Sequence, residues 1–126
     1  MIKVLYEDNH LLVVEKPVNI LSQGDNTSDD DMVNLLKKYL KEKYNKPGNV
    51  FVGLVHRLDR PVGGCMVFAK TSKAASRLSE QVRNKSFKKT YRAVIHGKMN
   101  KQEDNLMDYL YKNKKTNMVS VVSKNT

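Results

Sequence analysis

The chain has 126 residues, 40% of them hydrophobic, and its 23 Lys and Arg residues exceed its 13 Asp and Glu residues to give a net charge of +10. This length and hydrophobic content predict one compact domain over residues 1–126 and argue against disorder throughout. The positive charge favours a polyanionic partner such as nucleic acid, because each phosphate neutralised by Lys or Arg releases counterions; a basic, well-solvated surface without a ligand is the alternative.

Two short strands open the chain. Residues 2–6 and 11–16 are β-branched and Leu-rich runs around a polar turn, which predicts a hairpin or two neighbouring strands. Lys16-Pro17 ends the second strand, since proline offers no N–H to a neighbouring strand. The polar, glycine-containing segment 22–28 predicts a loop.

A helix is predicted after this loop. Ser28 is suited to the N-cap, and the three aspartates that follow place negative charge in the first turn, where the helix dipole favours it. Asn45-Lys46-Pro47-Gly48 should end the helix. The apolar residues recur at helical spacing and should face the core: Met32, Leu35, Leu36, Tyr39 and Leu40.

The middle of the chain predicts a strand, a bend, a strand and a second helix. Residues 50–55 form a short apolar run, and Gly63-Gly64 should bend the chain into the apolar strand 65–69. Ser72 is suited to cap a helix that ends near Asn84. The inner face of this helix should carry Ala75, Leu78 and Val82.

The remaining patterns predict strands. Residues 87–96 alternate, with Phe87, Lys89, Tyr91, Ala93 and Ile95 on one side, and weaker strand patterns lie at 106–111 and 117–122. The fold class is therefore α+β, with a mixed, mainly antiparallel sheet and two flanking helices. A strand so near the end of the sequence suggests an incomplete sheet or an exposed edge through which two chains could pair, and the oligomeric state stays open.

Cysteine use and hydropathy point to the cytoplasm. Cys65 is the single cysteine, so no intrachain disulfide can form, which suits a reducing compartment. It lies in an apolar run, and we expect it to be a buried small hydrophobe and not a nucleophile. Residues 1–8 lack the apolar core of a signal peptide, and no stretch approaches the ~18 apolar residues of a membrane span. We expect a cytoplasmic protein with no membrane partner.

The segment around Asp59 carries the strongest chemical pattern. Residues two apart in an extended segment point the same way, so Arg57 and Asp59 should share one face, with Arg60 adjacent. Two guanidinium groups favour an ionised carboxylate, which can act as a nucleophile or as a base. Arg–Asp clusters also form structural ion pairs, and the local sequence leaves both interpretations open.

Three longer motifs resemble those of a known family. The string GLVHRLDR at 53–60, followed by GGCMVFAKT at 63–71, resembles the central motif of RluA-type pseudouridine synthases. LVVEKP at 12–17 resembles their opening motif, and KKTYRAVIHG at 88–97 resembles their third block, including its tyrosine. The blocks occur in the family's order, and the resemblance runs from residue 3 to about residue 111.

The resemblance implies that the protein isomerises uridine in ribosomal or transfer RNA to pseudouridine, with Asp59 as the essential carboxylate. The target base must leave the helix, and the family pattern implies that Arg57 contacts the RNA where the base was and that Tyr91 lies against the uracil. Arg60 is expected to form an ion pair or a phosphate contact. The reaction changes no redox state, so neither a cofactor nor a metal is expected, and the three histidines show no ligand spacing. His56 should pack or hydrogen-bond.

The sequence departs from the family in two places. Pro61-Val62 stand before the glycines where relatives usually carry Thr or Ser. The family's last motif, of the type TGR…HQIR, is absent, so we expect the amino-terminal portion of a catalytic domain, inactive by itself. A non-catalytic basic RNA-binding module is the alternative, supported by the charge and the missing motif. A basic structural protein that assembles through its open sheet edge is a third hypothesis, which the HRLD string argues against.

Overall fold

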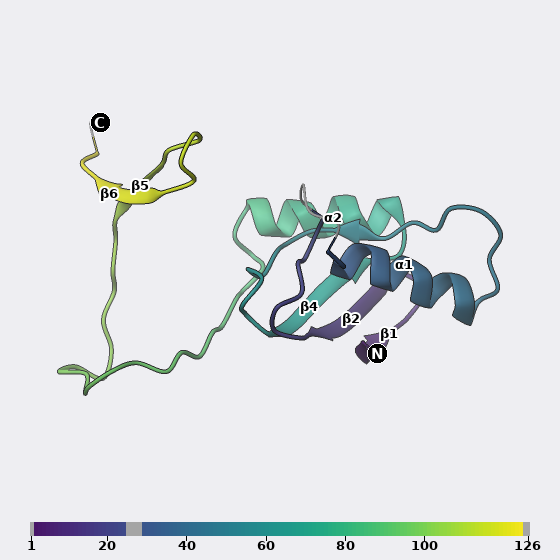
Figure 1. Ribbon diagram of the computed structural model, residues 1–126, viewed down its shortest axis with the longest axis horizontal. Helices are drawn as coiled ribbons and strands as arrows, with labels where there is room; N and C mark the ends of the chain where they lie inside the picture. Colours follow the sequence, from purple (N-terminus) through teal and green to yellow (C-terminus); the bar gives the residue numbers. More distant parts are fainter. Residues whose placement is uncertain (1, 25–28, 125–126) are drawn as a thin grey trace. The chain divides into compact units, whose positions relative to one another are not determined.

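The computed structural model describes residues 2–24 and 29–124. They form two compact units, which divide between Thr90 and Tyr91 (Figure 1). The predicted α+β class is confirmed, with two helices and antiparallel strand pairs in the described part of the chain. That residues 1–126 form one domain stays a prediction.

A four-stranded antiparallel sheet organises the first unit. Its strands are β1 (Lys3–Glu7), β2 (Leu11–Lys16), β3 (Gly53–Leu54) and β4 (Gly64–Ala69), in the order β1-β2-β4-β3. The predicted opening hairpin is confirmed. Asp8 fixes its turn, because Asp8 Oδ1 accepts hydrogen bonds of 2.7 Å from the backbone N–H groups of both His10 and Leu11.

The first helix, α1, covers one face of this sheet. It spans Met32–Lys43 and begins at Asp31, whose side chain accepts a 2.7 Å hydrogen bond from the Asn34 N–H. The predicted cap, Ser28, lies outside the described residues. Met32, Leu36 and Leu40 are fully or almost fully buried at helical spacing, whereas Leu35 and Tyr39 are half-buried at the edge of this stripe.

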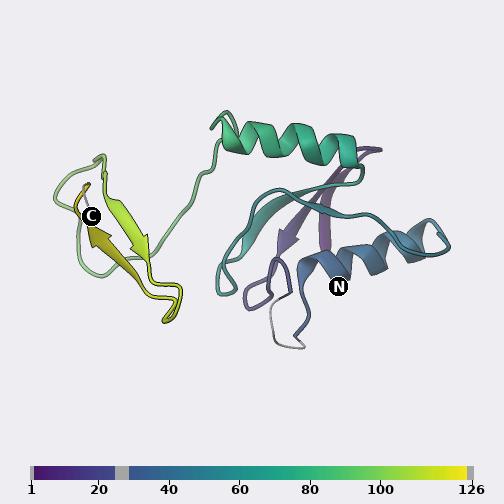
Figure 2. The same cartoon turned by 90° about the horizontal axis from the view of Figure 1, so that it is seen from above.

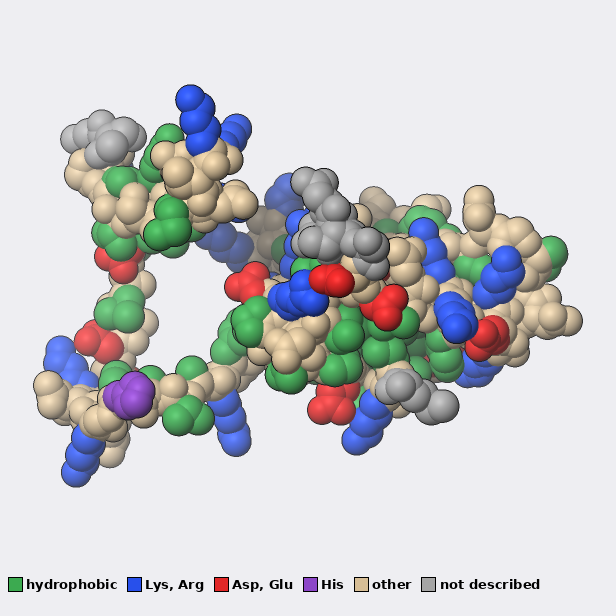
Figure 3. Space-filling model, in the orientation of Figure 1, with side chains coloured by type: hydrophobic (Ala, Val, Ile, Leu, Met, Phe, Trp, Pro, Cys, Tyr) green, Lys and Arg blue, Asp and Glu red, His purple; other side chains and the backbone are tan. Residues whose placement is uncertain are grey.

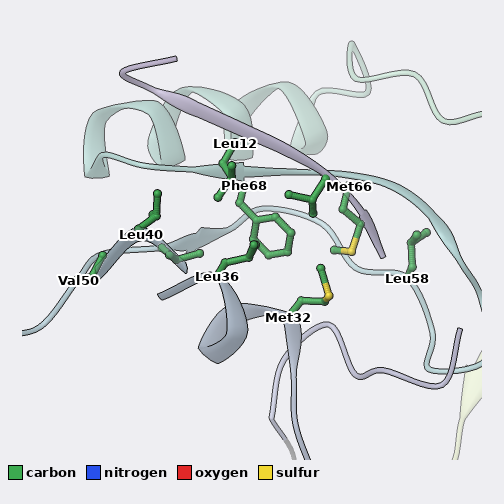
Figure 4. Close-up of a cluster of buried hydrophobic side chains, with 10 residues drawn as sticks. Leu12, Met32, Leu36, Leu40, Val50, Leu58, Met66 and Phe68 are labelled. Carbon is green, nitrogen blue, oxygen red and sulfur yellow. The ribbon is translucent and has the colours of Figure 1, made fainter. Parts of the chain in front are cut away.

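The main core lies between α1 and the sheet. Alternate residues of β2 and β4 point toward α1, and Leu12 pairs with Phe68 while Val14 pairs with Met66. All four side chains are completely buried (Figure 4). Burial of each such side chain contributes about 1.5–3 kcal/mol, so this layer fixes the positions of the loops at the sheet's ends.

The second helix, α2, spans Ser72–Arg83 and lies on the other side of the sheet from α1 (Figure 2). Thr71, and not the predicted Ser72, is its N-cap, and the Thr71 hydroxyl accepts from the Ala74 N–H at 3.1 Å. Gly53 allows the close approach of helix and sheet, because a Cβ there would lie 3.0 Å from the Cβ of Ala75 and 3.1 Å from the Cβ of Ala69. Ala74 is buried, and the predicted inner residues are half-buried: Ala75, Leu78 and Val82.

The strand predicted at 50–55 is present but shorter, as the two-residue β3. Two further local predictions are wrong. Cys65 is exposed, because Met66 and Phe68 take the buried face of β4 and Cys65 alternates to the other. Residues 87–96 form no strand, since no described segment pairs with them, and a strand requires a hydrogen-bonded neighbour.

The second unit contains one hairpin. Its strands, β5 (Tyr109–Lys112) and β6 (Val119–Val122), pair antiparallel, which confirms the strand patterns at 106–111 and 117–122. The turn includes Asn117 at φ 58°, a left-handed conformation that asparagine tolerates. Leu110, Val119 and Val121 are exposed on it.

Candidate active site

The Asp59 loop connects β3 to β4 and alternates between buried and exposed residues. His56 and Leu58 are buried, whereas Arg57, Asp59 and Arg60 are exposed. The exposed side chains at 57 and 59 agree with the predicted sharing of one face. A turn follows at once, in which the Val62 N–H donates to the Asp59 carbonyl oxygen at 2.9 Å.

The segment after β2 runs alongside this loop and fixes its backbone. The Ser22 hydroxyl is buried, donates to the Leu58 carbonyl oxygen at 2.6 Å and accepts from the Leu58 N–H at 3.0 Å. The Asn19 N–H donates to the Arg60 carbonyl oxygen at 2.7 Å, with Asn19 in a left-handed conformation at φ 68°. Asp59 therefore lies between two anchored neighbours, Leu58 and Arg60.

Lys16 anchors the same loop from the buried side. Its side chain is completely buried, and Nζ donates to the carbonyl oxygens of Pro17 at 3.0 Å, Arg60 at 3.1 Å and Val62 at 2.7 Å. Burial lowers the pKa of Lys16, and the negative charge of Asp59 opposes this shift. A buried cation thus supports the turn that carries the exposed carboxylate.

The two arginines of the loop bond to other partners. The Arg57 guanidinium donates to Gln23 Oε1 at 2.7 Å. The Arg60 guanidinium donates to the Asn19 carbonyl oxygen at 3.2 Å and forms an ion pair with Asp29 at 2.8 Å. Within residues 2–24 and 29–124, neither arginine forms an ion pair with Asp59, so its carboxylate stays open toward solvent.

His56 has a packing and hydrogen-bonding role, as predicted. Nε2 accepts a hydrogen bond from the Val67 N–H at 3.1 Å, and the ring lies 5.2 Å from that of Phe87. Burial lowers the pKa of His56, and the charge of Lys89 lowers it further. The described residues contain no group of three or more His, Cys, Asp and Glu side chains that could bind a metal.

Tyr91 belongs to the second unit, where its side chain is exposed. The strand that was expected to direct it is absent from the described structure. Its function beside Asp59 stays a prediction.

The family comparison covers nearly the whole chain. The family model described as RNA pseudouridylate synthase matches residues 10–126, which include the Asp59 loop and the segments that anchor it. The chain belongs to the RNA pseudouridylate synthase family. The resemblance to the RluA type is confirmed by its relatives. One is the ribosomal large subunit pseudouridine synthase C of Buchnera aphidicola, 34% identical over 89% of this chain and 35% of that protein.

Two further proteins are similar to this member of the pseudouridylate synthase family. The ribosomal large subunit pseudouridine synthase D of Borreliella burgdorferi is 32% identical over 98% of this chain and 39% of its own length. The solved structure of human RNA pseudouridylate synthase domain containing 4 matches with a TM-score of 0.56 and 25% identity, over 67% of this chain and 30% of that one. The chain spans about a third of the length of the curated relatives it matches.

The sequence patterns did not indicate the residues that support the loop. The sequence predicts that Lys16-Pro17 ends the second strand and belongs to the opening motif, and Ser22 and Gln23 lie in the predicted loop 22–28. No role is predicted for Asn19. The contacts of these residues with the loop join positions 34 to 46 residues apart, which no local periodicity reveals. The only sequence feature that indicated such support was Lys16-Pro17, which belongs to the motif that resembles the family's opening motif.

Proposed function

We propose that the protein isomerises uridine in RNA to pseudouridine, with Asp59 as the catalytic residue. One observation carries the proposal: the family match includes an exposed carboxylate on a turn that buried groups anchor from several sides. Anchoring of this kind favours catalysis, because a reacting group must be kept within a fraction of an ångström of its productive position.

The chemistry requires one carboxylate and no added reactant. The N1–C1′ glycosidic bond breaks, the uracil turns, C5 bonds to C1′, and the proton on C5 is replaced by one at N1. Hydrolytic glycosidases instead use two carboxylates on either side of the bond. Asp59 would engage either the sugar as a nucleophile or the base as a proton acceptor.

The other loop residues are proposed to act on the RNA. A uridine inside a stem must be flipped out, which costs a few kcal/mol of stacking and pairing. Arg57 is exposed, and its link to Gln23 directs it, so it would contact the RNA where the base was. Arg60 is already bonded to Asp29 and would assist as a phosphate contact. Tyr91 would stack on the uracil, at about 1–3 kcal/mol per base.

We propose ribosomal RNA of the large subunit as the substrate and the cytoplasm as the location. The names of the relatives in Buchnera aphidicola and Borreliella burgdorferi support this RNA. The charge of +10 supports a polyanionic partner, and Lys and Arg side chains are spread over the face shown in Figure 3. No described helix reaches the length and apolarity of a membrane span.

The test compares Asp59→Ala with the unchanged protein. Uridine and pseudouridine are separated by chromatography after digestion of total RNA, using the 126-residue chain and the gene product at its natural length. We expect the natural-length protein to convert uridine and Asp59→Ala to abolish conversion while RNA binding is retained. Asp30→Ala, which also removes an exposed aspartate, should convert normally.

Two results would redirect the proposal. Conversion by Asp59→Ala would show that another group carries the reaction. Salt-sensitive RNA binding without conversion at either length would favour the non-catalytic RNA-binding module.

A further inference from the structure

A second candidate site lies in the first unit, at the groove between α2 and the turn that joins β1 to β2. The groove has a volume of about 360 Å³ and is lined by Asp8, His10, Leu11, Lys73, Arg77 and Leu78. Sites for small ligands occupy about 300–1,000 Å³, so the groove has the capacity for one nucleotide-sized group.

This groove is separate from the Asp59 loop. In the pairing of β2 with β4, Leu11 faces Ala69 at one end, and Lys16 faces Gly64 at the other. Lys16 marks the end where Asp59 lies, and Leu11 lines the groove. Five residue steps at ~3.3 Å place the two ends ~17 Å apart along the strand.

The groove carries two cations that are available to a ligand. Lys73 and Arg77 are four residues apart on α2 and therefore lie on the same face of the helix. Both side chains are exposed, and neither forms an ion pair within the described residues. Two cations at this spacing can contact one phosphate or two successive phosphates.

The acidic residue of the groove is engaged in its own turn. Asp8 Oδ1 accepts from the His10 and Leu11 N–H groups, and Oδ2 accepts from the Tyr6 hydroxyl at 2.8 Å. Both carboxylate oxygens therefore have donors, and Asp8 does not pair with Lys73 or Arg77. Half-buried Leu11 and Leu78 add an apolar surface beside the cations.

We propose that this groove binds a nucleotide of the substrate RNA at a distance from the target uridine, with its phosphate on Lys73 and Arg77 and its base against Leu11 and Leu78. The inference rests on the proposed function, which supplies the RNA. Phosphate contacts fix the register of a nucleic acid on a protein. A contact near the Leu11 end of β2, ~17 Å along the strand from the end where Asp59 lies, would thus help to align the target uridine with the carboxylate.

The test uses the double variant Lys73→Ala/Arg77→Ala in the natural-length protein, with a transcript of large-subunit ribosomal RNA as the probe. Its dissociation constant is measured over a series of salt concentrations. We expect binding about tenfold weaker at low salt and a log–log salt slope shallower by about 1.4, from two lost contacts at ~0.7 each.

The matched control is Lys37→Ala/Lys41→Ala. These lysines have the same spacing, are exposed on α1 and lie across the sheet from α2. Both double variants remove two positive charges, and alanine suits both helices. Loss of affinity only in the α2 variant supports the groove, whereas equal loss in both would overturn it by showing that net charge alone acts.

A crosslinking measurement locates the bound RNA directly and so tests the groove without relying on the dissociation constant. A transcript containing 4-thiouridine should crosslink to the peptide that contains Leu78, and the α2 variant should reduce this product. Bound RNA that gives no such crosslink would overturn the inference. Uridine conversion is recorded in the same samples. If the RNA is converted but both double variants lose affinity equally, the proposed groove is rejected and the proposed isomerase activity is retained. If only the α2 variant loses affinity and no RNA is converted, the isomerase activity is rejected and the groove is retained.

Discussion

At the scale of single residues, Lys16 connects the buried interior to the Asp59 loop. Its Nζ donates to the carbonyl oxygens of Pro17, Arg60 and Val62, and the Arg60 oxygen also accepts from the Asn19 N–H. An unpaired buried acceptor costs about 1–3 kcal/mol. Lys16→Met should therefore lower the free energy of unfolding by at least about 1–3 kcal/mol, measured by urea denaturation.

The control for this prediction is Lys38→Met, which changes an exposed lysine in α1. It should alter the unfolding free energy by less than about 0.5 kcal/mol. Equal effects of the two substitutions would show that the carbonyl contacts of Lys16 do not stabilise the loop.

His56 predicts a pH dependence of stability. Burial lowers its pKa from an ordinary value of 6.5, so the unfolded chain binds a proton more readily than the folded protein. The contribution of neutral His56 to the free energy of unfolding should be fully present above pH ~6.5 and should fall as the pH drops below this value. Urea unfolding from pH 5 to 8 should show this slope. His56→Gln keeps an acceptor for the Val67 N–H and should flatten it; an unchanged slope would assign the dependence to other groups.

Residue-level contacts were the hardest to predict. The exposure of both Arg57 and Asp59 follows from the geometry of an extended segment, in which residues two apart point the same way, and it could be predicted from the sequence. The ion pair of Arg60 with Asp29 and the burial of Lys16 could not be predicted, because each depends on a segment 31 to 46 residues away.

At the scale of elements, Glu7 joins β1 to α1 and β4. Its carboxylate is buried, which raises its pKa. Hydrogen bonds from Lys70, Tyr44, Lys43 and Tyr39 outweigh this effect and hold the pKa well below its usual range. The ion pair with Lys70 has an N–O distance of 2.6 Å, and that with Lys43 has one of 2.9 Å. This cluster fastens the far end of α1 to the sheet.

Glu7→Gln should therefore destabilise the protein by about 1–3 kcal/mol at pH 7. Because the folded-state pKa is depressed well below 4.5, the stabilisation is complete above pH ~4.5 and declines progressively as the pH falls from there toward the folded-state pKa. Urea unfolding at pH 7, pH 4 and pH 3 measures the difference between the two proteins, which should be only slightly smaller at pH 4 and clearly smaller at pH 3. Glu42→Gln, on the exposed face of α1, should have little effect at any of these pH values, and a difference for Glu7→Gln that is as large at pH 3 as at pH 7 would contradict the account.

The elements themselves were largely predictable. Strand β2 and both helices follow from apolar patterning, because each has one face that is more buried than the other. Strand β1, whose residues are exposed or half-buried, follows instead from its β-branched and Leu-rich composition. Periodicity does not report pairing, however. Residues 87–96 alternate without a described partner, and β4 is apolar on both faces, so its pattern did not reveal that Cys65 is exposed.

At the scale of the whole molecule, the chain spans about a third of its curated relatives, and its two units are separately compact. Asp59 and its anchors all lie in the first unit, whereas Tyr91 lies in the second. The expectation that the 126-residue chain alone is inactive therefore stays a prediction.

Release of the uracil C5 hydrogen is the measurement that tests the central claim most directly. Forming the C5–C1′ bond must free this hydrogen, so RNA labelled with tritium at uracil C5 should release tritium into water with the natural-length protein. Asp59→Asn should release none while binding the same RNA within about threefold, because a neutral amide preserves the loop but removes the carboxylate. Release by Asp59→Asn at the unchanged protein's rate would contradict the assignment of Asp59 as the catalytic residue.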